Sequence, residues 1–352
     1  MDAQSLLTAD SLRARARAAA GRHLVHPAAS RSLPDCSPAE ATAISRRALD
    51  TILTRPFRVG PLPTESVYAE LLERVHRRVR RSERIYITIG YGPLKNQNSV
   101  SYSRADWAEL FALAHLAALH NKVQAVYPPG LEFRIVFDDS TLIIANRVDH
   151  RLIDSYTASI SNLIDALGYR GLFLPTMRQS AFSWLLNFGF YQLASRRVRR
   201  WEADPANREK LAQMNASARR NLSVPNSLTA SEADQSVTDA AHRYRVYWEA
   251  LQLSGLTKSR RRIIGMYLDG TQHHIPQTVA LHLTTLDKGQ VTQPWQGEGM
   301  LLDNGHQKLE PFVMTAGRRP RYRTEQIEGL DLVPVGGFER IAVAFPVDHS
   351  PE

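Results

Sequence analysis

The sequence predicts an α/β fold whose central sheet is mixed but largely parallel and is flanked by helices. A segment of alternating β-branched residues, Ile85–Ile89, is followed by a polar loop, an amphipathic helix, a turn and a second strand, Leu131–Phe137. This order is typical of a crossover between two parallel strands. Helical patterns then dominate residues 175–262, and short strand patterns return after them. We therefore expect a helical insertion and a β-rich C-terminal part.

The first 40 residues differ in composition from the rest of the chain. Residues 1–40 are rich in Ala, Arg, Ser and Pro, and an Arg-rich, acid-poor segment also resembles a transit peptide. We expect a basic leader that is flexible or loosely docked, in which Leu12–Arg22 has the pattern of a basic helix. Residues 41–352 are long enough to bury a large core, and we expect them to form a single α/β domain.

Capping residues and four-residue spacing predict the helices that come before the second strand. A helix is predicted from Pro38 to about Thr54, with Ser37 as its cap. A second helix is predicted over Glu65–Arg81, where valine and leucine recur at four-residue spacing. Ser103–Asp106 resembles a capping box, and it precedes a predicted amphipathic helix over Asp106–Asn121.

The remaining elements follow from turn residues and short apolar runs. We expect a turn at Tyr127–Gly130, a helix at about Asp149–Leu167 and a polar break at Asn221–Asp234 within the helical region. Asp303–Gly305 is typical of a hairpin turn. The strands expected in the C-terminal part are Gln277–Thr285, Gly299–Leu302, Val313–Thr315, Asp331–Pro334 and Arg340–Phe345.

The composition restricts the class of protein. Hydrophobic residues make up 43% of the chain, which is enough for a packed core. The single cysteine, Cys36, excludes an internal disulfide framework and fits a reducing compartment. The longest apolar run is too short to cross a bilayer, and there is no charged-then-apolar leader. We therefore expect a cytoplasmic protein with no membrane partner.

The basic charge balance raises the question of an anionic partner. The formal net charge is +9, but the arginines fall in separate clusters that do not alternate with stacking aromatic residues. The chain also lacks helix-turn-helix, zinc-finger and RNP patterns. We therefore expect no nucleic-acid partner and interpret most of these arginines as surface charge, with one or two available to bind a phosphate.

Polar residues follow both strands of the predicted crossover, at the ends where α/β sheets bind ligands. Lys95 stands in the loop after the first strand, where a lysine can act as a base, a carbonyl partner or a phosphate contact. The alternative is a solvated loop lysine. Asp138 and Asp139 follow the second strand, and Arg134 shares a face of that strand with Asp138. An Arg–Asp pair beside a lysine suits an amino-acid substrate, but two such aspartates are equally typical of a turn.

Further candidates lie near the C-terminus. His282 lies within a predicted strand, where a histidine is more often packed and hydrogen-bonded than catalytic. Trp295 and Gln296 stand in a turn and suit either a pocket wall or a cover for the core. The pair His273–His274 lacks companions at metal-ligand spacing, so we expect no metal site. The chain also lacks the Walker A, Rossmann, nucleophile-elbow and kinase motifs.

The order of these segments resembles the isocyanide (isonitrile) synthase family, which includes the pyoverdine/dityrosine biosynthesis proteins. That family has a strand followed by F-P-x-K-S-x-N, and Tyr91–Asn98 is similar, with the proline, the lysine and the last asparagine in matching places. The family's V-Y-P-P-G turn matches Val126–Gly130, and its V-S-D-x-x-V-x-x-Y helix start resembles Val148–Tyr156. The resemblance covers roughly residues 80–305, and the order of the motifs is more specific than any one of them.

Other family motifs are matched only in part. The strand that ends in D-G-R is similar to Phe133–Asp138, but Asp139 and Ser140 replace the glycine and the arginine. The family's L-S-I-H strand and P-W-H motif correspond to Leu281–Thr284 and Pro294–Gln296, so the last histidine of each motif is replaced. These departures indicate a diverged member of the family.

The resemblance implies a condensation without metal or cofactor. The amine of an L-amino acid attacks the ketone of ribulose 5-phosphate to give an imine, and proton transfers, phosphate loss and carbon–carbon cleavage leave one sugar carbon on nitrogen as the isocyanide. An amino acid and a phosphosugar are thus the implied partners. The resemblance implies Lys95 as base or as carbonyl or phosphate contact, Asp138 to orient the amine, and Arg134 or a loop arginine to hold an anion. The remaining expected site residues are His282 as catalytic, and Tyr91, Asn96, Asn98, Asp139, Trp295 and Gln296 as substrate-binding.

Two other functions stay open beside this one. A related enzyme could use the same fold for a different amino-acid or amine condensation. The replacements at Ser140, Thr284 and Gln296 also favour a ligand-binding protein without catalysis.

Overall fold

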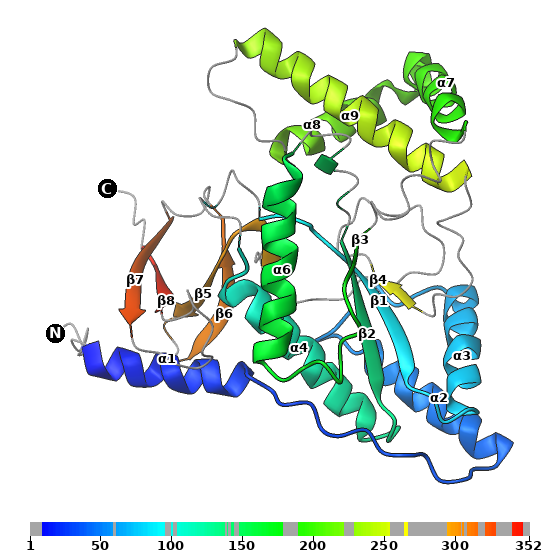
Figure 1. Cartoon of the computed structure of the whole chain (residues 1–352), viewed down its shortest axis with the longest axis vertical. Coiled ribbons are helices and arrows are strands. Elements are labelled where there is room, and N and C mark those ends of the chain that lie inside the picture. Colours follow the sequence, from blue (N-terminus) through cyan, green and yellow to red (C-terminus); the bar gives the residue numbers. More distant parts are fainter. Residues whose placement is uncertain are drawn as a thin grey trace.

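The computed structural model of the chain contains two sheets and the helices that surround them (Figure 1). It describes residues 9–58, 61–95, 100, 104–137, 139, 142–143, 148–178, 189–221, 229–253, 264–266, 294–303, 305, 308–315, 321–328 and 340–347. Within these residues, one sheet has the strand order β3-β2-β1-β4 and the other has the order β6-β5-β8-β7. The predicted α/β class, with flanking helices and a β-rich C-terminal part, is therefore confirmed.

The first sheet is built around the predicted crossover. β1 (Ile85–Tyr91) pairs in parallel with β2 (Leu131–Phe137), and α4 (Trp107–Gln124) connects the two strands. Ile85 lies opposite Leu131, and Tyr91 lies opposite Phe137. Because side chains alternate along a strand, both residues of each pair point to the same face of the sheet.

Two short outer strands extend this sheet. β3 (Met177–Arg178) pairs with β2, and β4 (Ile264–Met266) pairs with β1, both in parallel. α6 (His150–Ala166), which the sequence predicts at about Asp149–Leu167, is capped by Asp149 and connects β2 to β3. The sequence does not predict these outer strands, because runs of two or three residues are too short to show an alternation.

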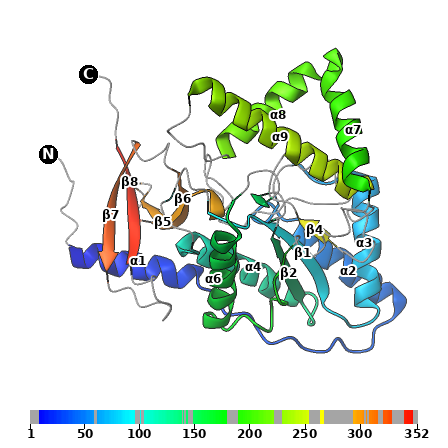
Figure 2. The same cartoon turned by 45° about the horizontal axis from the view of Figure 1, so that its top comes forward.

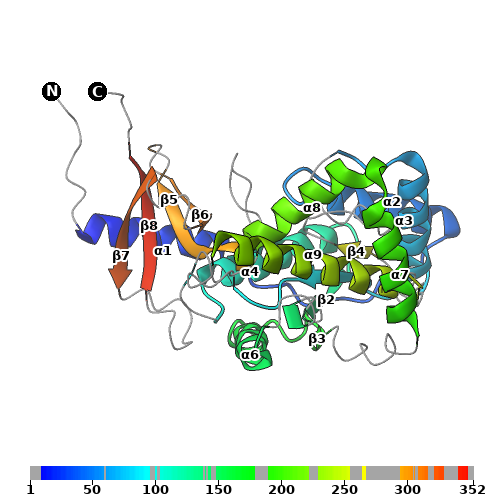
Figure 3. The ribbon, with the colours of Figure 1, turned by 90° about the horizontal axis from the view of Figure 1, so that it is seen from above.

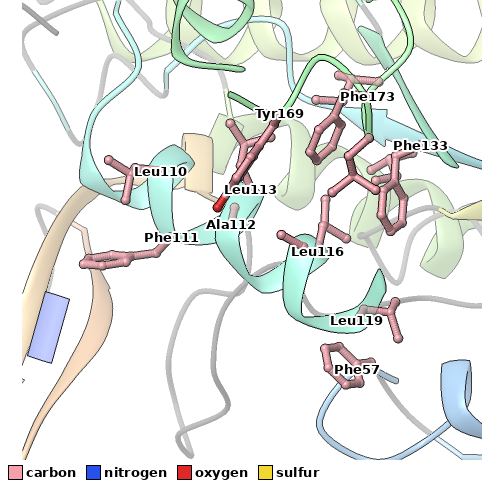
Figure 4. Close-up of a cluster of buried hydrophobic side chains, with 14 of the residues drawn as sticks. Phe57, Leu110, Phe111, Ala112, Leu113, Leu116, Leu119, Phe133, Tyr169 and Phe173 are labelled. Carbon is pink, nitrogen blue, oxygen red and sulfur yellow. The ribbon is translucent and has the colours of Figure 1, made fainter. Parts of the chain in front are cut away.

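Helix α4 lies between the two sheets and forms the centre of the hydrophobic core. It is apolar around most of its circumference, as expected for a helix that is covered on all sides. Figure 4 shows Phe111 of this helix on the side of the C-terminal strands and Leu116 on the side of Phe133. These side chains are buried, and so is Phe173, which stacks on Phe133 with 5.5 Å between the ring centroids.

The start of α4 differs in detail from the expectation. The N-cap is Asp106, and the capping box is formed by Asp106 and Glu109 rather than by Ser103 and Asp106. Asp106 accepts a hydrogen bond from the backbone N–H of Ala108, and Glu109 accepts one from the backbone N–H of Asp106. The sequence contains both patterns. Because α4 begins at Trp107, the cap is Asp106, and Glu109 is the acid three residues after that cap.

The N-terminal segment is packed against the fold in its described part, which differs from the expected flexible or loosely docked leader. α1 (Ala9–His23) runs beneath the C-terminal sheet (Figure 1), and its Ala16, Ala19 and Ala20 are fully buried. Arg15 forms an ion pair of 2.9 Å with Asp303. Small residues let the helix approach the strands closely, and the ion pair joins it to the C-terminal sheet.

Two further helices lie beside the first sheet, on the side away from the C-terminal sheet. α2 (Pro38–Ile52) begins at the predicted cap, because Ser37 and Glu40 form a capping box. α3 (Glu65–Val79) follows the predicted spacing. Figure 2 shows both helices beside β1 and β4, far from the C-terminal sheet.

The C-terminal sheet contains the predicted hairpin. β5 (Glu298–Asp303) pairs antiparallel with β6 (Leu309–Met314), and Gly305 in the turn has a φ of +75°. β8 (Arg340–Pro346) pairs with β5, and β7 (Tyr322–Glu328) forms the outer edge. The sequence does not predict β7, because its exposed, polar residues show no alternation. The expected strands Gln277–Thr285 and Asp331–Pro334 lie outside the described residues.

The helical insertion is confirmed over its described residues. It contains α7 (Phe190–Ala203), η2 (Pro205–Asn207), α8 (Arg208–Asn221) and α9 (Ala230–Leu253). α7 and α9 share a small core of their own, to which Tyr247 contributes. Figures 1 and 3 show these helices beyond the carboxyl ends of the parallel strands, where they lie over the sheet. None of the helices in the described ranges is long and apolar enough to span a membrane.

Candidate active site

The candidate site lies at the carboxyl end of β1. This strand ends at Tyr91, and Lys95 stands in the loop that follows it. The N-terminus of α4 and the short 3-10 turn η4 (Pro294–Gln296) lie against Lys95. Three segments that are far apart in the sequence therefore meet at the edge of the sheet where α/β proteins bind ligands.

Lys95 is buried at the centre of this site, with 1% of its surface exposed. Its Nζ lies 3.0 Å from Asp106 Oδ1 and 2.9 Å from Glu109 Oε1. It also donates hydrogen bonds to the carbonyl oxygens of Pro294, at 2.9 Å, and Gly297, at 2.8 Å. A lysine is almost never fully buried unless it is paired, and these four oxygen atoms provide the pairing.

Asp106 joins three segments through its carboxylate. Oδ1 accepts from Lys95 Nζ and from the backbone N–H of Ala108, and Oδ2 accepts from the backbone N–H of Gly299 at 3.2 Å. The residue also stands at the N-terminus of α4, where the helix dipole favours a negative charge. Asp106 therefore binds Lys95 while it holds the start of β5 against the helix.

Glu109 lies one helical turn further along α4 and is fully buried. Its Oε1 accepts from Lys95 Nζ at 2.9 Å and from the Tyr156 hydroxyl at 2.8 Å. Its Oε2 accepts from the backbone N–H of Asp106 at 2.7 Å. Tyr156 lies on α6, so the carboxylate of Glu109 connects the lysine of the β1 loop to the next crossover helix.

Aromatic side chains form a wall beside this polar network. The Tyr91 ring packs against Trp295, with 4.7 Å between the centroids, and against Phe137 at 5.8 Å. Gly92 lies directly under the indole, and a Cβ atom built there would come within 2.4 Å of it. Only a glycine at this position lets the β1 loop pass this close to Trp295.

The ionisation states follow from burial and from neighbouring charges. Burial alone would lower the pKa of Lys95, but the nearby carboxylates of Asp106 and Glu109 outweigh it and raise that pKa. Burial raises the pKa of Glu109 to about 8, although the Lys95 ammonium opposes this change. Burial, together with the charge of Glu109, raises the pKa of Tyr91 and of Tyr156 well above the usual range. At neutral pH, Lys95 is therefore an ammonium, and both tyrosines are neutral.

Arg134 and Asp139 are placed differently from Lys95. Arg134 lies opposite Thr88 in the sheet register, and its guanidinium lies 5.7 Å from the centroid of the Tyr86 ring. These residues occupy the face of the sheet opposite to that of Tyr91 and Phe137. Asp139 is fully buried just after β2. Arg134 therefore lies on the opposite face of the sheet from the aromatic side chains of Tyr91 and Phe137.

The other expected site residues divide into two groups. Trp295 and Gln296 are half-buried in η4, next to the carbonyl groups that Lys95 binds. Asn96, Asn98, Asp138 and His282 lie outside the described residues. In the part of the chain that the structure describes, no three His, Cys, Asp or Glu side chains are grouped so that they could hold a metal ion.

Sequence reasoning did not single out Asp106, Glu109 or Tyr156 as site residues. The spacing D-x-x-E at the start of a helix indicated only a cap, which these two acids also form. Two features of that helix could have identified Glu109. It is the only acidic residue of a largely apolar helix, and it follows a lysine-bearing loop at a strand end.

Comparisons with known proteins identify both a family and a fold. Residues 75–257 match the family described as pyoverdine/dityrosine biosynthesis protein, whereas no curated protein matches the chain. The fold is similar to that of the PvcA protein from Pseudomonas aeruginosa, whose crystal structure superimposes with a TM-score of 0.63 at 16% identity. This alignment covers 85% of this chain and 99% of that one. The family match includes Lys95, Glu109 and Tyr156 but ends before Pro294.

Proposed function

Since the chain belongs to the pyoverdine/dityrosine biosynthesis protein family, we propose that this biosynthetic protein is an isonitrile-synthase-like enzyme. In the proposed reaction, the amine of an L-amino acid condenses with the ketone of ribulose 5-phosphate, which gives an imine and water. Proton transfers, loss of phosphate and carbon–carbon cleavage then leave one sugar carbon on the nitrogen. The product is an isocyanide for a specialised metabolite, and ribulose 5-phosphate is the cosubstrate.

The contact between Lys95 and the turn Pro294–Gly297 is the observation that carries this proposal. Both segments resemble family motifs, and their motif residues meet in one buried network although 199 positions separate Lys95 from Pro294. A resemblance of sequence order alone does not require two such distant motifs to touch. Their meeting at the carboxyl end of β1 supports a shared functional site.

In this proposal, Lys95 is a positioning residue. A base must have a free electron pair, but the ammonium of Lys95 has a raised pKa and is surrounded by four oxygen atoms. Its role is to hold the start of α4 and the turn that carries Trp295 against the end of β1. We propose substrate contacts for Tyr91 and Trp295 at the aromatic wall. Further proposed contacts come from Asn96, Asn98, Asp138, Asp139, His282 and Gln296.

The test is a reaction of the intact chain with ribulose 5-phosphate and each proteinogenic L-amino acid, followed by mass spectrometry. A product that carries one carbon from 13C-labelled sugar is expected with at least one amino acid. Lys95→Ala is expected to abolish it, and Lys308→Ala, which removes an exposed lysine of the C-terminal part, is the matched control. If wild-type chain yields no sugar-dependent product with any amino acid, the proposal is wrong.

A second candidate is a related enzyme that uses the fold for a different amino-acid or amine condensation. The observation that favours it is the replacement of the family's histidine by Gln296, half-buried beside the carbonyl groups that bind Lys95. A glutamine can donate and accept hydrogen bonds but cannot exchange a proton near neutral pH. Conversion of an amino acid without incorporation of the labelled sugar carbon would support this second function.

A further inference from the structure

The hydroxyl of Tyr91 is a buried polar group without a hydrogen bond of ordinary geometry to any described residue. Tyr91 is 1% exposed, and its ring is fixed between Trp295 and Phe137. The neighbouring Tyr156 hydroxyl acts on Tyr91 as a hydrogen-bonding group and opposes the rise in the Tyr91 pKa. A buried hydroxyl that gives up its hydrogen bond to water without a full replacement is unfavourable, so its retention in this wall points to a bound molecule as a further partner.

When Glu109 is ionised, the network behind Tyr91 contains one more negative than positive charge. Among the described residues, the Lys95 ammonium faces the carboxylates of both Asp106 and Glu109. Asp106 is the better-stabilised anion, because it accepts from two backbone N–H groups and stands at a helix N-terminus. Glu109 is completely buried, so its carboxylate is the one on which an additional proton relieves the excess charge.

The hydrogen-bond direction also favours proton uptake by Glu109. Tyr156 donates its hydroxyl proton to Glu109 Oε1, so the Tyr156 oxygen has its lone pairs free to accept from a neighbouring donor. The neighbouring hydroxyl is that of Tyr91, whose pKa is influenced by both Tyr156 and Glu109. Four titratable or charged groups among the described residues face Glu109, namely Lys95, Asp106, Tyr156 and Tyr91. Three of them come from elements other than α4.

We propose that Glu109 is the terminal proton acceptor of this site and receives a substrate proton through the hydroxyl groups of Tyr91 and Tyr156. The inference rests on the proposed function, in which the ammonium of the amino acid must lose a proton before its nitrogen attacks a ketone. The substrate N–H gives its proton to Tyr91, the Tyr91 proton passes to Tyr156, and the Tyr156 proton passes to the Glu109 carboxylate. The substrate nitrogen keeps the electron pair of the broken N–H bond, and no oxidant or reductant is needed.

The kinetic test compares Glu109→Gln with the wild-type chain across the pH range. Because the ionised carboxylate accepts the proton, wild-type kcat/KM is expected to fall as the pH decreases through about 8. Glu109→Gln is expected to lose at least about 100-fold in kcat/KM and to lose this acidic limb. Tyr156→Phe should show a comparable loss, and it replaces Glu109→Gln if the latter fails to fold. Glu325→Gln on the exposed edge strand is the matched control.

A second readout separates this inference from the proposed reaction. Infrared difference spectra of the intact chain should show a protonated carboxyl band that disappears as the pH rises through about 8 and is absent in Glu109→Gln. If no such band titrates, Glu109 does not exchange a proton, and the inference is overturned whatever the chain catalyses. If wild-type chain forms product but Glu109→Gln and Tyr156→Phe keep its rate and acidic limb, the inference fails and the proposed function stands. If the band titrates but no amino acid gives a sugar-dependent product, the proposed reaction fails while Glu109 retains its role as proton acceptor.

Discussion

Lys95 Nζ lies 2.9 Å from the carbonyl oxygen of Pro294, although 199 positions separate the two residues. The contact joins the loop after β1 to the turn before β5, and the carboxylates of Asp106 and Glu109 complete it. The two sheets are therefore connected through one buried ammonium as well as through the apolar side chains of α4. The same group that shapes the candidate site thus stabilises the fold.

We predict that Lys95→Met destabilises the chain by about 3–5 kcal/mol, because it removes the cation that binds the Asp106 carboxylate and the buried Glu109 side chain. The methionine fills a similar volume, so lost packing contributes little. Urea unfolding followed by circular dichroism measures the difference. Lys308→Met, on an exposed lysine, is expected to change stability by less than about 0.5 kcal/mol. A loss below about 1 kcal/mol in Lys95→Met would mean that the buried ion pairs are not needed for stability.

The two aspartate N-caps, Asp106 and Asp149, provide a matched comparison. Asp149 accepts one hydrogen bond, from the backbone N–H of Arg151 at an exposed helix start, so Asp149→Ala should cost about 1 kcal/mol. Asp106 also binds Lys95 and the backbone of Gly299, so Asp106→Ala should cost about 3 kcal/mol or more. Chemical unfolding of both variants tests this difference. Equal losses would show that Asp106 acts only as a helix cap.

The sequence predicts the elements of this fold better than the contacts between them. The crossover from β1 to β2 and its helix follow from local periodicity, and Lys95 follows from its place at a strand end. The Glu109–Tyr156 hydrogen bond joins two helices, and no local pattern determines which of their side chains meet. Arg134 illustrates the same limit. Whether Arg134 and Tyr91 lie on the same face of the sheet depends on the register between β1 and β2. The sequence of neither strand alone determines that register.

The packing of α1 is a second example of this limit. Its alanine-rich, arginine-rich sequence has a weak apolar face, which predicts loose association at most. In the structure, small alanines fit against the C-terminal strands, and Arg15 reaches Asp303. The sequence contains both partners of the ion pair, but their contact depends on a tertiary arrangement formed almost 300 positions later.

Two glycines should respond in opposite ways to the addition of a methyl group. A Cβ atom at Gly299 would lie 2.0 Å from the backbone nitrogen of Ala108, where β5 crosses the start of α4. The backbone of a buried helix cannot move away easily, so Gly299→Ala should destabilise the chain by about 3 kcal/mol. A Cβ atom at Gly171 would meet no atom within 4 Å, so Gly171→Ala should be neutral or slightly stabilising. Thermal unfolding distinguishes the two, and a neutral Gly299→Ala would contradict the close approach of strand and helix.

His120 should make the stability of the chain depend on pH. Its Nδ1 lies 3.1 Å from the backbone nitrogen of Leu131, and its Nε2 lies 3.3 Å from the carbonyl oxygen of Ala28. These contacts suit a neutral imidazole whose Nδ1 accepts the N–H of Leu131, and protonation would remove that acceptor. Burial lowers the pKa of His120 below its usual value of 6.5, and the nearby Arg84 contributes in the same direction, although the carbonyl groups of Ala28 and Leu131 oppose both.

The sign of the effect follows from the two states of this imidazole. As the pH falls below about 6.5, the unfolded chain binds a proton that the folded chain does not, so the free energy of unfolding decreases until the folded pKa is passed. Urea unfolding at about pH 8 and about pH 5 should therefore show a smaller loss for His120→Asn than for wild type. His150→Asn, at the exposed start of α6, should retain the wild-type difference. If His120→Asn also retains it, the neutral imidazole is not responsible for the pH dependence, and the acid sensitivity must come from other groups.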